Sequence, residues 1–192
     1  IAELMEVDDD ETLGRAWRAM IEIGFVGGDI GLVEEASTRL LECARRTASV
    51  KSIVVVTSDK CYTNHEWHWA YREKSQLGGR DPYAASKSCA ELIVHSYRES
   101  YFSSEASDKT AALLASVRAG NVIGGGDWAP HRLVPDIIST LREDRPLVLR
   151  HPKAIRPWQH VLEPLRGYLQ VAENLYGGDR QSAGPWNFGP VD

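Results

Sequence analysis

The chain has 192 residues, with 22 lysines and arginines against 27 aspartates and glutamates, so its formal net charge is −5. Hydrophobic residues make up 43% and charged residues 26%, which is ordinary for a globular protein that buries a core. A net negative chain without a basic block argues against nucleic-acid binding, whose affinity depends largely on phosphate neutralisation.

Membrane insertion and secretion are also disfavoured by the sequence. The longest strongly apolar stretch is the run from Ile53 to Thr57, far below the about 18 residues that span a bilayer. The first ten residues are acidic, where a signal peptide would be basic and then apolar. Three cysteines, Cys43, Cys61 and Cys89, form neither a CxxC pair nor a disulfide framework. These features predict a soluble, cytoplasmic protein.

Residues 1–31 are expected to form a leader made of a helix and a linker. Leu13 and Trp17 have helical spacing within residues 8–24, behind an acidic first turn. The glycines of Gly24–Gly31 lack the GxGxxG spacing and follow a helix rather than a strand. We therefore interpret this stretch as a flexible connection and not as a dinucleotide-binding loop.

Helical and strand patterns alternate after this leader. The run over residues 52–57 is continuously apolar and β-branched, which is typical of a strand buried in a parallel sheet, and residues 112–118 are expected to form a second buried strand. This alternation predicts an α/β fold with a parallel sheet and flanking helices. The remaining expected elements are helices over 32–47, 84–102, 133–143 and 164–176, the last with proline at its first position, and short strands over 147–150 and 186–188.

Apolar spacing assigns a buried face to each of the first two helices. The expected inward residues are Val33, Ala36, Leu40 and Ala44 in the first helix and Cys89, Ile93 and Tyr97 in the second. We expect Cys43 and Cys89 to be small core residues rather than reactive thiols.

Tyr83 and Lys87 stand four residues apart where the 84–102 helix starts, so they share one helix face. A free tyrosine has a pKa of about 10, and an ammonium group nearby favours the phenolate and lowers such a value. Such a pair removes a proton from a sugar hydroxyl while hydride leaves the same carbon. The alternative interpretation is an exposed pair of side chains without chemistry.

A second polar group, Ser58-Asp59-Lys60, follows the 52–57 strand directly. Because the carboxyl ends of parallel strands face the ligand crevice, these side chains are placed for chemistry. The alternative is a turn or helix-capping cluster, which serine and aspartate favour. A strand-end serine 25 residues before a Tyr-x-x-x-Lys motif resembles the arrangement in short-chain dehydrogenases/reductases.

One histidine pair has the spacing of metal ligands. His65 and His68 are three residues apart, but Trp67 and Trp69 beside them predict a packed loop. A third ligand at a recognised spacing is missing, so we expect no metal site.

Four longer runs resemble the CDP-glucose 4,6-dehydratase family, an extended branch of the short-chain dehydrogenases/reductases. They occupy residues 56–62, 77–87, 118–128 and 156–164, in the family's order, and the resemblance extends over roughly residues 32–192. It implies part of a Rossmann-like catalytic domain over 32–124 and part of a small substrate-binding region over 125–192. Sister 4,6-dehydratases carry Thr-Asp-Glu where this chain has Ser58-Asp59-Lys60.

The resemblance implies an NAD-dependent hydro-lyase of deoxysugar and O-antigen biosynthesis. Such an enzyme oxidises C4 of CDP-glucose, eliminates water across C5 and C6, and returns the hydride to C6. The implied catalytic roles are Tyr83 as base at O4, assisted by Lys87 and Ser58, then Asp59 as acid at the C6 hydroxyl and Lys60 as base at C5. Tyr83 and Lys87 are also the implied NAD contacts. An ion pair between Asp59 and Lys60 is the alternative to these last two roles.

Substrate and partner contacts are implied in the same way. Asn121 matches a position that contacts the nucleotide diphosphate, and Arg156 matches a phosphate-binding arginine. We expect His160 to support the loop of Arg156. A nucleotide sugar is the implied substrate, and a homodimer or other homo-oligomer is the implied assembly, with helices 32–47 and 84–102 available to pack into a dimer.

The family's glycine-rich turn, which holds the NAD pyrophosphate on a helix N-terminus, is not found in this chain. Two alternatives therefore stay open beside the dehydratase. One is a nucleotide-sugar 4-epimerase, against which Asp59 and Lys60 argue because an epimerase eliminates nothing. The other is a non-catalytic remnant that acts at most as a subunit partner.

Overall fold

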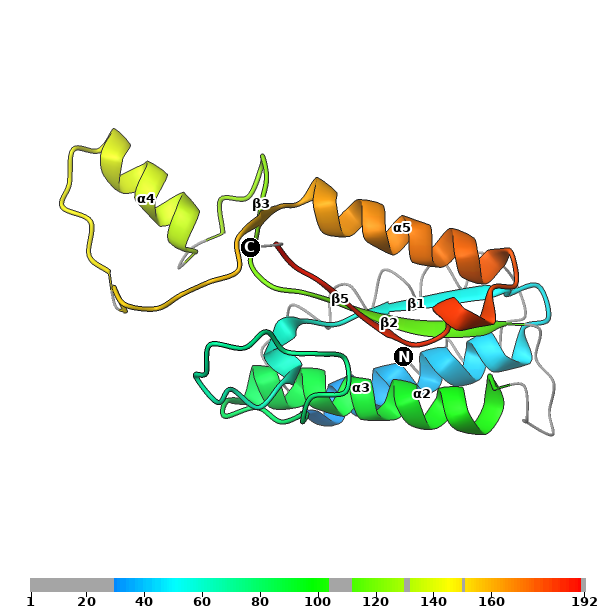
Figure 1. Ribbon diagram of the computed structural model, residues 1–192. Helices are drawn as coiled ribbons and strands as arrows, with labels where there is room; N and C mark the ends of the chain where they lie inside the picture. The colour runs from blue at the N-terminus through cyan, green and yellow to red at the C-terminus, as the bar shows by residue number, and fades with distance from the viewer. Residues whose placement is uncertain (1–29, 104–111, 130–131, 150, 191–192) are drawn as a thin grey trace.

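Figure 1 shows the computed structural model of the chain, which describes residues 30–103, 112–129, 132–149 and 151–190. The expected helix over 8–24 and most of the glycine-rich connection lie outside the described residues. None of the helices in the described part is long and apolar enough to cross a bilayer.

The order of elements is that of an α/β protein. Each predicted helix or strand that forms begins and ends within two residues of its predicted bounds. The expected strand over 147–150 is wrong, because residues 147–149 have no neighbouring strand to pair with among the described residues. Pro164 is the third residue of its helix and not the first. The elements are α2 (Ile30–Arg46), β1 (Ser52–Val56), η2 (Asp59–Cys61), α3 (Pro82–Tyr101), β2 (Leu113–Ala119), β3 (Val122–Ile123), α4 (Leu133–Arg142), β4 (Gln159–His160), α5 (Leu162–Tyr176), η3 (Arg180–Ser182) and β5 (Pro185–Phe188).

The main sheet is parallel and has the strand order β1-β2-β5. Its register places Ile53 opposite Leu114 and Val117 opposite Trp186. The central strand β2 is buried along its whole length, as predicted, including its two polar residues Ser116 and Arg118. In β1 burial alternates and the strand ends at Val56, which is 50% exposed.

Helices cover both faces of this sheet, α2 and α3 on one side and α5 on the other (Figure 1). Successive residues of β2 point to opposite faces, so the strand feeds two cores. Leu114 packs with Leu41 and Val94 beneath α2 and α3. Val117 packs with Leu175 beneath α5. Burying each such leucine contributes roughly 1.5–3 kcal/mol to the free energy of unfolding.

The buried faces of α2 and α3 are rotated from the predicted ones, because each contains a buried polar residue. In α2 the buried residues include Ser37 and Leu41, and in α3 they include Glu91 and Val94. A pattern built from apolar residues alone does not register Ser37 and Glu91. Of the predicted inward residues Ala44 is buried, and the others lie half-buried at the margins: Val33, Ala36, Leu40, Cys89, Ile93 and Tyr97.

A second, two-stranded parallel sheet joins β3 to β4. β3 begins shortly after β2, and β4 ends just before α5, so this pairing brings the two ends of segment 124–158 together. A hydrogen bond of 2.8 Å from Val161 N to Ile123 O extends the pairing. The segment carries α4, which lies apart from the main sheet in Figure 1.

Candidate active site

The candidate site starts at the carboxyl end of β1, where the chain turns into η2. Ser58 caps this short helix, since its Oγ accepts a hydrogen bond from Lys60 N at 3.2 Å and donates to Asp59 Oδ1 at 3.1 Å. Cys61 N donates to Ser58 O at 3.1 Å, and Tyr62 N donates to Asp59 O at 3.3 Å. The three residues therefore form a capping cluster, and that cluster stands at the edge of the sheet where ligands bind in parallel folds.

Tyr83 and Lys87 lie in the first two turns of α3. Asp81 starts the helix by accepting a hydrogen bond from Ala84 N at 2.9 Å, with Pro82 as the first helical residue. Lys87 Nζ lies 5.6 Å from the centre of the Tyr83 ring, so the two side chains share a face as predicted. Burial lowers the pKa of Lys87, because desolvation disfavours its ammonium form.

The N-terminal half of α3 is attached to the Ser58 turn by a side-chain hydroxyl that binds the backbone of the turn. The Ser88 hydroxyl donates to Cys61 O at 2.8 Å and to Ala84 O at 3.0 Å. The two predicted catalytic groups thus meet at one end of the sheet. In the described part of the chain, no hydrogen bond or ion pair joins the side chains of one group directly to those of the other.

Each of the two residues predicted to contact the substrate precedes one strand of the β3–β4 pairing, Asn121 before β3 and Arg156 before β4. Asn121 follows β2, and its carbonyl accepts a hydrogen bond from Gln159 N at 3.1 Å. Arg156 is exposed, and its Nη1 donates to Ile155 O at 3.0 Å. His160 Nδ1 accepts from Leu162 N at 3.3 Å, so this contact supports the start of α5 rather than the loop of Arg156.

Gly120 allows the 156–158 segment to approach the site. A Cβ at this position would lie 2.5 Å from Pro157 Cγ and 3.1 Å from Asp59 Oδ2. We therefore expect Gly120→Ala to lower the free energy of unfolding by roughly 1–3 kcal/mol, measured by denaturant unfolding. Gly125→Ala is the matched control, because a Cβ there meets nothing within 4 Å. Equal losses in both variants would contradict the close approach at Gly120.

A buried ion pair that the sequence analysis missed lies beneath the site. Arg118 donates to Glu91 through two hydrogen bonds of 2.8 and 2.5 Å, and the side chains are 4% and 2% exposed. The hydroxyls of Thr57 and Ser116 donate to the same carboxylate. An arginine at the end of an otherwise apolar strand was the available signal, since a buried charge needs a partner.

Arg118 also connects the 61–80 loop to β5. Its Nη1 donates to Tyr62 Oη at 2.5 Å and to Glu73 O at 3.0 Å. Tyr62 Oη in turn donates to Asn187 Oδ1 at 2.7 Å. The Tyr62 ring is stacked on Tyr71 at 5.3 Å between centroids. The loop is thereby fixed against the sheet.

Both members of the pair are charged. Desolvation acts to raise the pKa of Glu91, but the hydrogen bonds and charge of Arg118 outweigh it and hold that pKa below its usual range. Burial likewise acts to lower the pKa of Arg118, but the hydrogen bonds and charge of Glu91 outweigh burial, so the pKa of Arg118 is raised. Burial also raises the pKa of the nearby Cys61 thiol to about 12.

The loop around His65 and Trp69 is packed only in part as predicted. Trp67 lies between His65 and Tyr71, with ring centroids at 4.6 and 5.5 Å, whereas Trp69 is 77% exposed. Among the described residues, no three histidine, cysteine, aspartate or glutamate side chains are gathered to hold a metal ion.

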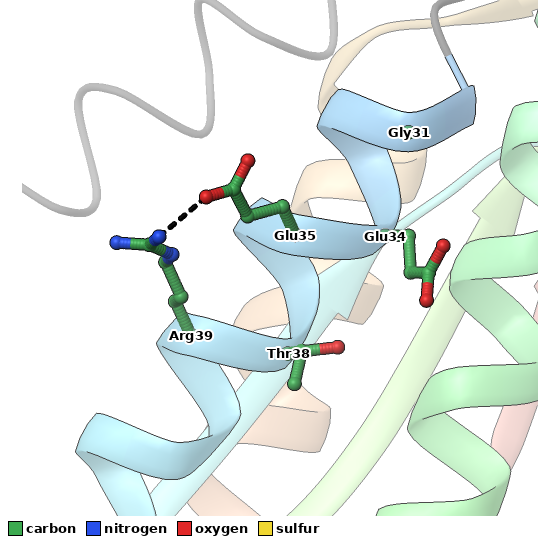
Figure 2. Close-up of a pocket in the computed structure, with 5 residues that line it drawn as sticks. All are labelled: Gly31, Glu34, Glu35, Thr38 and Arg39. Atoms are coloured by element: carbon green, nitrogen blue, oxygen red, sulfur yellow. Dashed lines mark ion pairs between the residues drawn. The ribbon is translucent and has the colours of Figure 1, made fainter. Parts of the chain in front are cut away.

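A pocket elsewhere lies along α2 (Figure 2). Glu35 and Arg39 form an ion pair of 2.5 Å on its wall. We do not assign it to the candidate reaction, because none of the candidate catalytic residues lines it. Its lining residues are Gly31, Glu34, Glu35, Thr38 and Arg39.

Comparison with known proteins matches the chain to one family profile and to relatives that include two 4,6-dehydratases. The profile of the NAD dependent epimerase/dehydratase family matches residues 34–187. CDP-glucose 4,6-dehydratase of Salmonella typhimurium is 50% identical over 156 residues, which are 81% of this chain and 44% of the relative. dTDP-D-glucose 4,6-dehydratase of Homo sapiens is 28% identical over 137 residues, 71% of this chain and 36% of the relative. The chain thus spans less than half the length of either relative.

Solved structures agree in fold. A dTDP-glucose 4,6-dehydratase double mutant from Streptomyces venezuelae, with NAD and DAU bound, has a TM-score of 0.66 at 23% identity and covers 87% of this chain and 48% of that one. UDP-glucuronic acid 4-epimerase from Bacillus cereus, in complex with UDP-glucuronic acid and NAD, has a TM-score of 0.66 at 18% identity and covers 83% and 46%. The predicted Rossmann-like sheet with flanking helices is thereby confirmed.

Proposed function

Because the chain belongs to the NAD dependent epimerase/dehydratase family, we propose that it carries the catalytic face of a CDP-glucose 4,6-dehydratase. One observation carries the proposal: the Ser58-Asp59-Lys60 turn follows β1, and α3, which carries Tyr83 and Lys87 in its first two turns, is joined to that turn by the Ser88 hydroxyl on Cys61 O. Acid, base and hydroxyl groups for an oxidation followed by an elimination are thus present at one place. The 50% identical relative, a CDP-glucose 4,6-dehydratase, supports the choice of nucleotide.

Tyr83 accepts the O4 proton of the glucosyl unit while hydride leaves C4. The base is the Tyr83 phenolate, which becomes the neutral phenol as it takes the proton; Lys87, with its ammonium 5.6 Å from the centre of the Tyr83 ring, stabilises that phenolate before the transfer. The Ser58 hydroxyl turns from Asp59 toward O4 and orders that oxygen. These roles divide the oxidation step among one base and two positioning groups.

Asp59 and Lys60 act in the elimination. The new C4 ketone makes the C5 proton acidic, because the resulting carbanion is conjugated with the carbonyl. Lys60 removes that proton, and Asp59 donates a proton to the departing C6 hydroxyl, so that water leaves. A proton then returns to C5 as the hydride arrives at C6.

The residues present fit the nicotinamide end of NAD. Lys87 is half-buried and has no carboxylate partner among the described residues, so its ammonium is available to ribose hydroxyls beside Tyr83. When bound, NAD supplies the acceptor for the hydride of C4. The residues that hold its pyrophosphate are not among those identified in this chain.

We also propose how the chain is divided and assembled. Residues 32–124 contribute the catalytic part, and residues 125–192 contribute to a substrate-binding region, with Asn121 and Arg156 at the nucleotide diphosphate. A homodimer forms through α2 and α3, and Leu92 is 56% exposed on the latter.

The proposal is tested by calorimetric titration of NAD into the purified chain, followed by CDP-glucose. Saturable NAD binding and loss of one water from the sugar nucleotide, detected by mass spectrometry, are the expected results. Lys87→Met should abolish NAD binding, whereas Lys74→Met, at an exposed loop position, should leave it unchanged.

The outcomes separate the alternatives. A sugar nucleotide isomerised without loss of water identifies a 4-epimerase. Absence of both NAD binding and product identifies a non-catalytic chain and overturns the proposed function.

A further inference from the structure

The Ser58–Cys61 turn is tethered on both sides by one buried ion pair. On the entry side, the Thr57 hydroxyl donates to the Glu91 carboxylate. On the exit side, the Tyr62 hydroxyl accepts from Arg118 Nη1 at 2.5 Å. The residues that flank the candidate catalytic turn therefore bind opposite members of the same pair.

Glu91 also sets the place of this turn relative to the catalytic helix. It follows Lys87 by one helical turn and Tyr83 by two, so the three residues share a face of α3. Its carboxylate then reaches across to Thr57 at the end of β1. Among the described residues no hydrogen bond or ion pair joins the two groups of candidate catalytic side chains, and this carboxylate, like the Ser88 hydroxyl on Cys61 O, links α3 to the turn.

Stability alone does not account for such an arrangement. Replacing both members of a buried ion pair with apolar residues is often neutral or stabilising. Apolar side chains provide no directional bonds, however, and here those bonds reach both flanks of one turn.

We propose that Glu91 and Arg118 are a positioning pair, which holds the Ser58–Cys61 turn at a fixed distance and orientation from the catalytic face of α3. Neither residue touches the reacting atoms, and both act through Thr57 and Tyr62. The identity of the reacting groups rests on the proposed function, whereas the tether is a property of the fold.

Ser116 provides a matched control. Its hydroxyl donates to Glu91 Oε2 at 2.8 Å, from a position in β2 that is as fully buried as the pair itself. Ser116→Ala and Thr57→Val each remove one hydrogen bond to the same carboxylate. Only Thr57 adjoins the catalytic turn.

Cys61 reports on the turn, because it lies within it and is 0% exposed. In a chain with Cys43→Ser and Cys89→Ser, the rate of thiol labelling under native conditions measures how often the turn opens. We expect Thr57→Val to raise this rate about tenfold, because a bond to a charged acceptor is lost. Thr57→Ser should restore the original rate, and Ser116→Ala should leave it within about twofold.

Kinetics provide the second measurement. In a chain that turns over CDP-glucose, Thr57→Val should lower kcat about tenfold with KM unchanged, and Ser116→Ala should change neither. If the unsubstituted chain has no activity, the proposed function fails and the labelling rates alone decide this inference. Equal acceleration of Cys61 labelling by Thr57→Val and Ser116→Ala, or acceleration by neither, overturns it.

Discussion

Arg118→Ala should lower the free energy of unfolding by about 3–5 kcal/mol, because it leaves the Glu91 carboxylate buried without its counter-charge. Denaturant unfolding at neutral pH measures the loss. Arg145→Ala is the control, since Arg145 pairs with Glu143 at 2.6 Å on the surface, with both side chains more than half exposed. Exposed pairs contribute about 0–1 kcal/mol. Similar losses in the two variants would contradict the buried pairing.

The deficit of Arg118→Ala should shrink as the pH falls. In the unsubstituted chain the pKa of Glu91 is lowered by Arg118, so the stability it contributes is present above its unfolded pKa of about 4.3 and is lost as pH falls through the folded value. Without Arg118, burial dominates and raises this pKa, so acid protonates the folded carboxylate first and stabilises the variant. A deficit that stays constant between pH 7 and pH 4 would show that the charge of Glu91 is not its cause.

Tyr83→Phe should lower kcat for dehydration by about 10²–10⁴-fold, because phenylalanine cannot accept the O4 proton. Steady-state rates with CDP-glucose and NAD measure the effect. Tyr176→Phe, at the exposed end of α5, removes the same hydroxyl elsewhere and should leave kcat unchanged. Activity of Tyr83→Phe within a few fold of that of the unsubstituted chain would exclude this residue as the base.

Local patterns predicted those parts of the fold that depend on local chemistry. The 112–118 run is apolar apart from Ser116 and Arg118, and it supplies most of the buried central strand β2. The run at 147–150 looked similar but forms no strand among its described residues, since a strand requires a partner that the local pattern does not reveal. The buried faces of α2 and α3 were predicted wrongly for a related reason, because buried polar residues such as Ser37 give no apolar signal.

The same distinction applies to the site. Tyr83 and Lys87 were predicted because their spacing places them on one helix face, and Ser58 because it follows a strand. Glu91 and Arg118 are 27 residues apart on different elements, so their pairing arises only from the packing of α3 on β2. Their part in holding the candidate turn could therefore not be read from spacing.

The short β3–β4 pairing has a consequence for how such a protein diversifies. It closes the chain just before and just after segment 124–158, so the two ends of that segment stay adjacent whatever lies between them. The entropy of closing a loop rises only slowly with its length. Insertions, deletions or replacement of the whole segment would leave the register of the main sheet intact. Under the proposed function, the ligand contacts on this segment can thus be exchanged as a module while the side chains proposed to react, after β1 and in α3, are inherited unchanged.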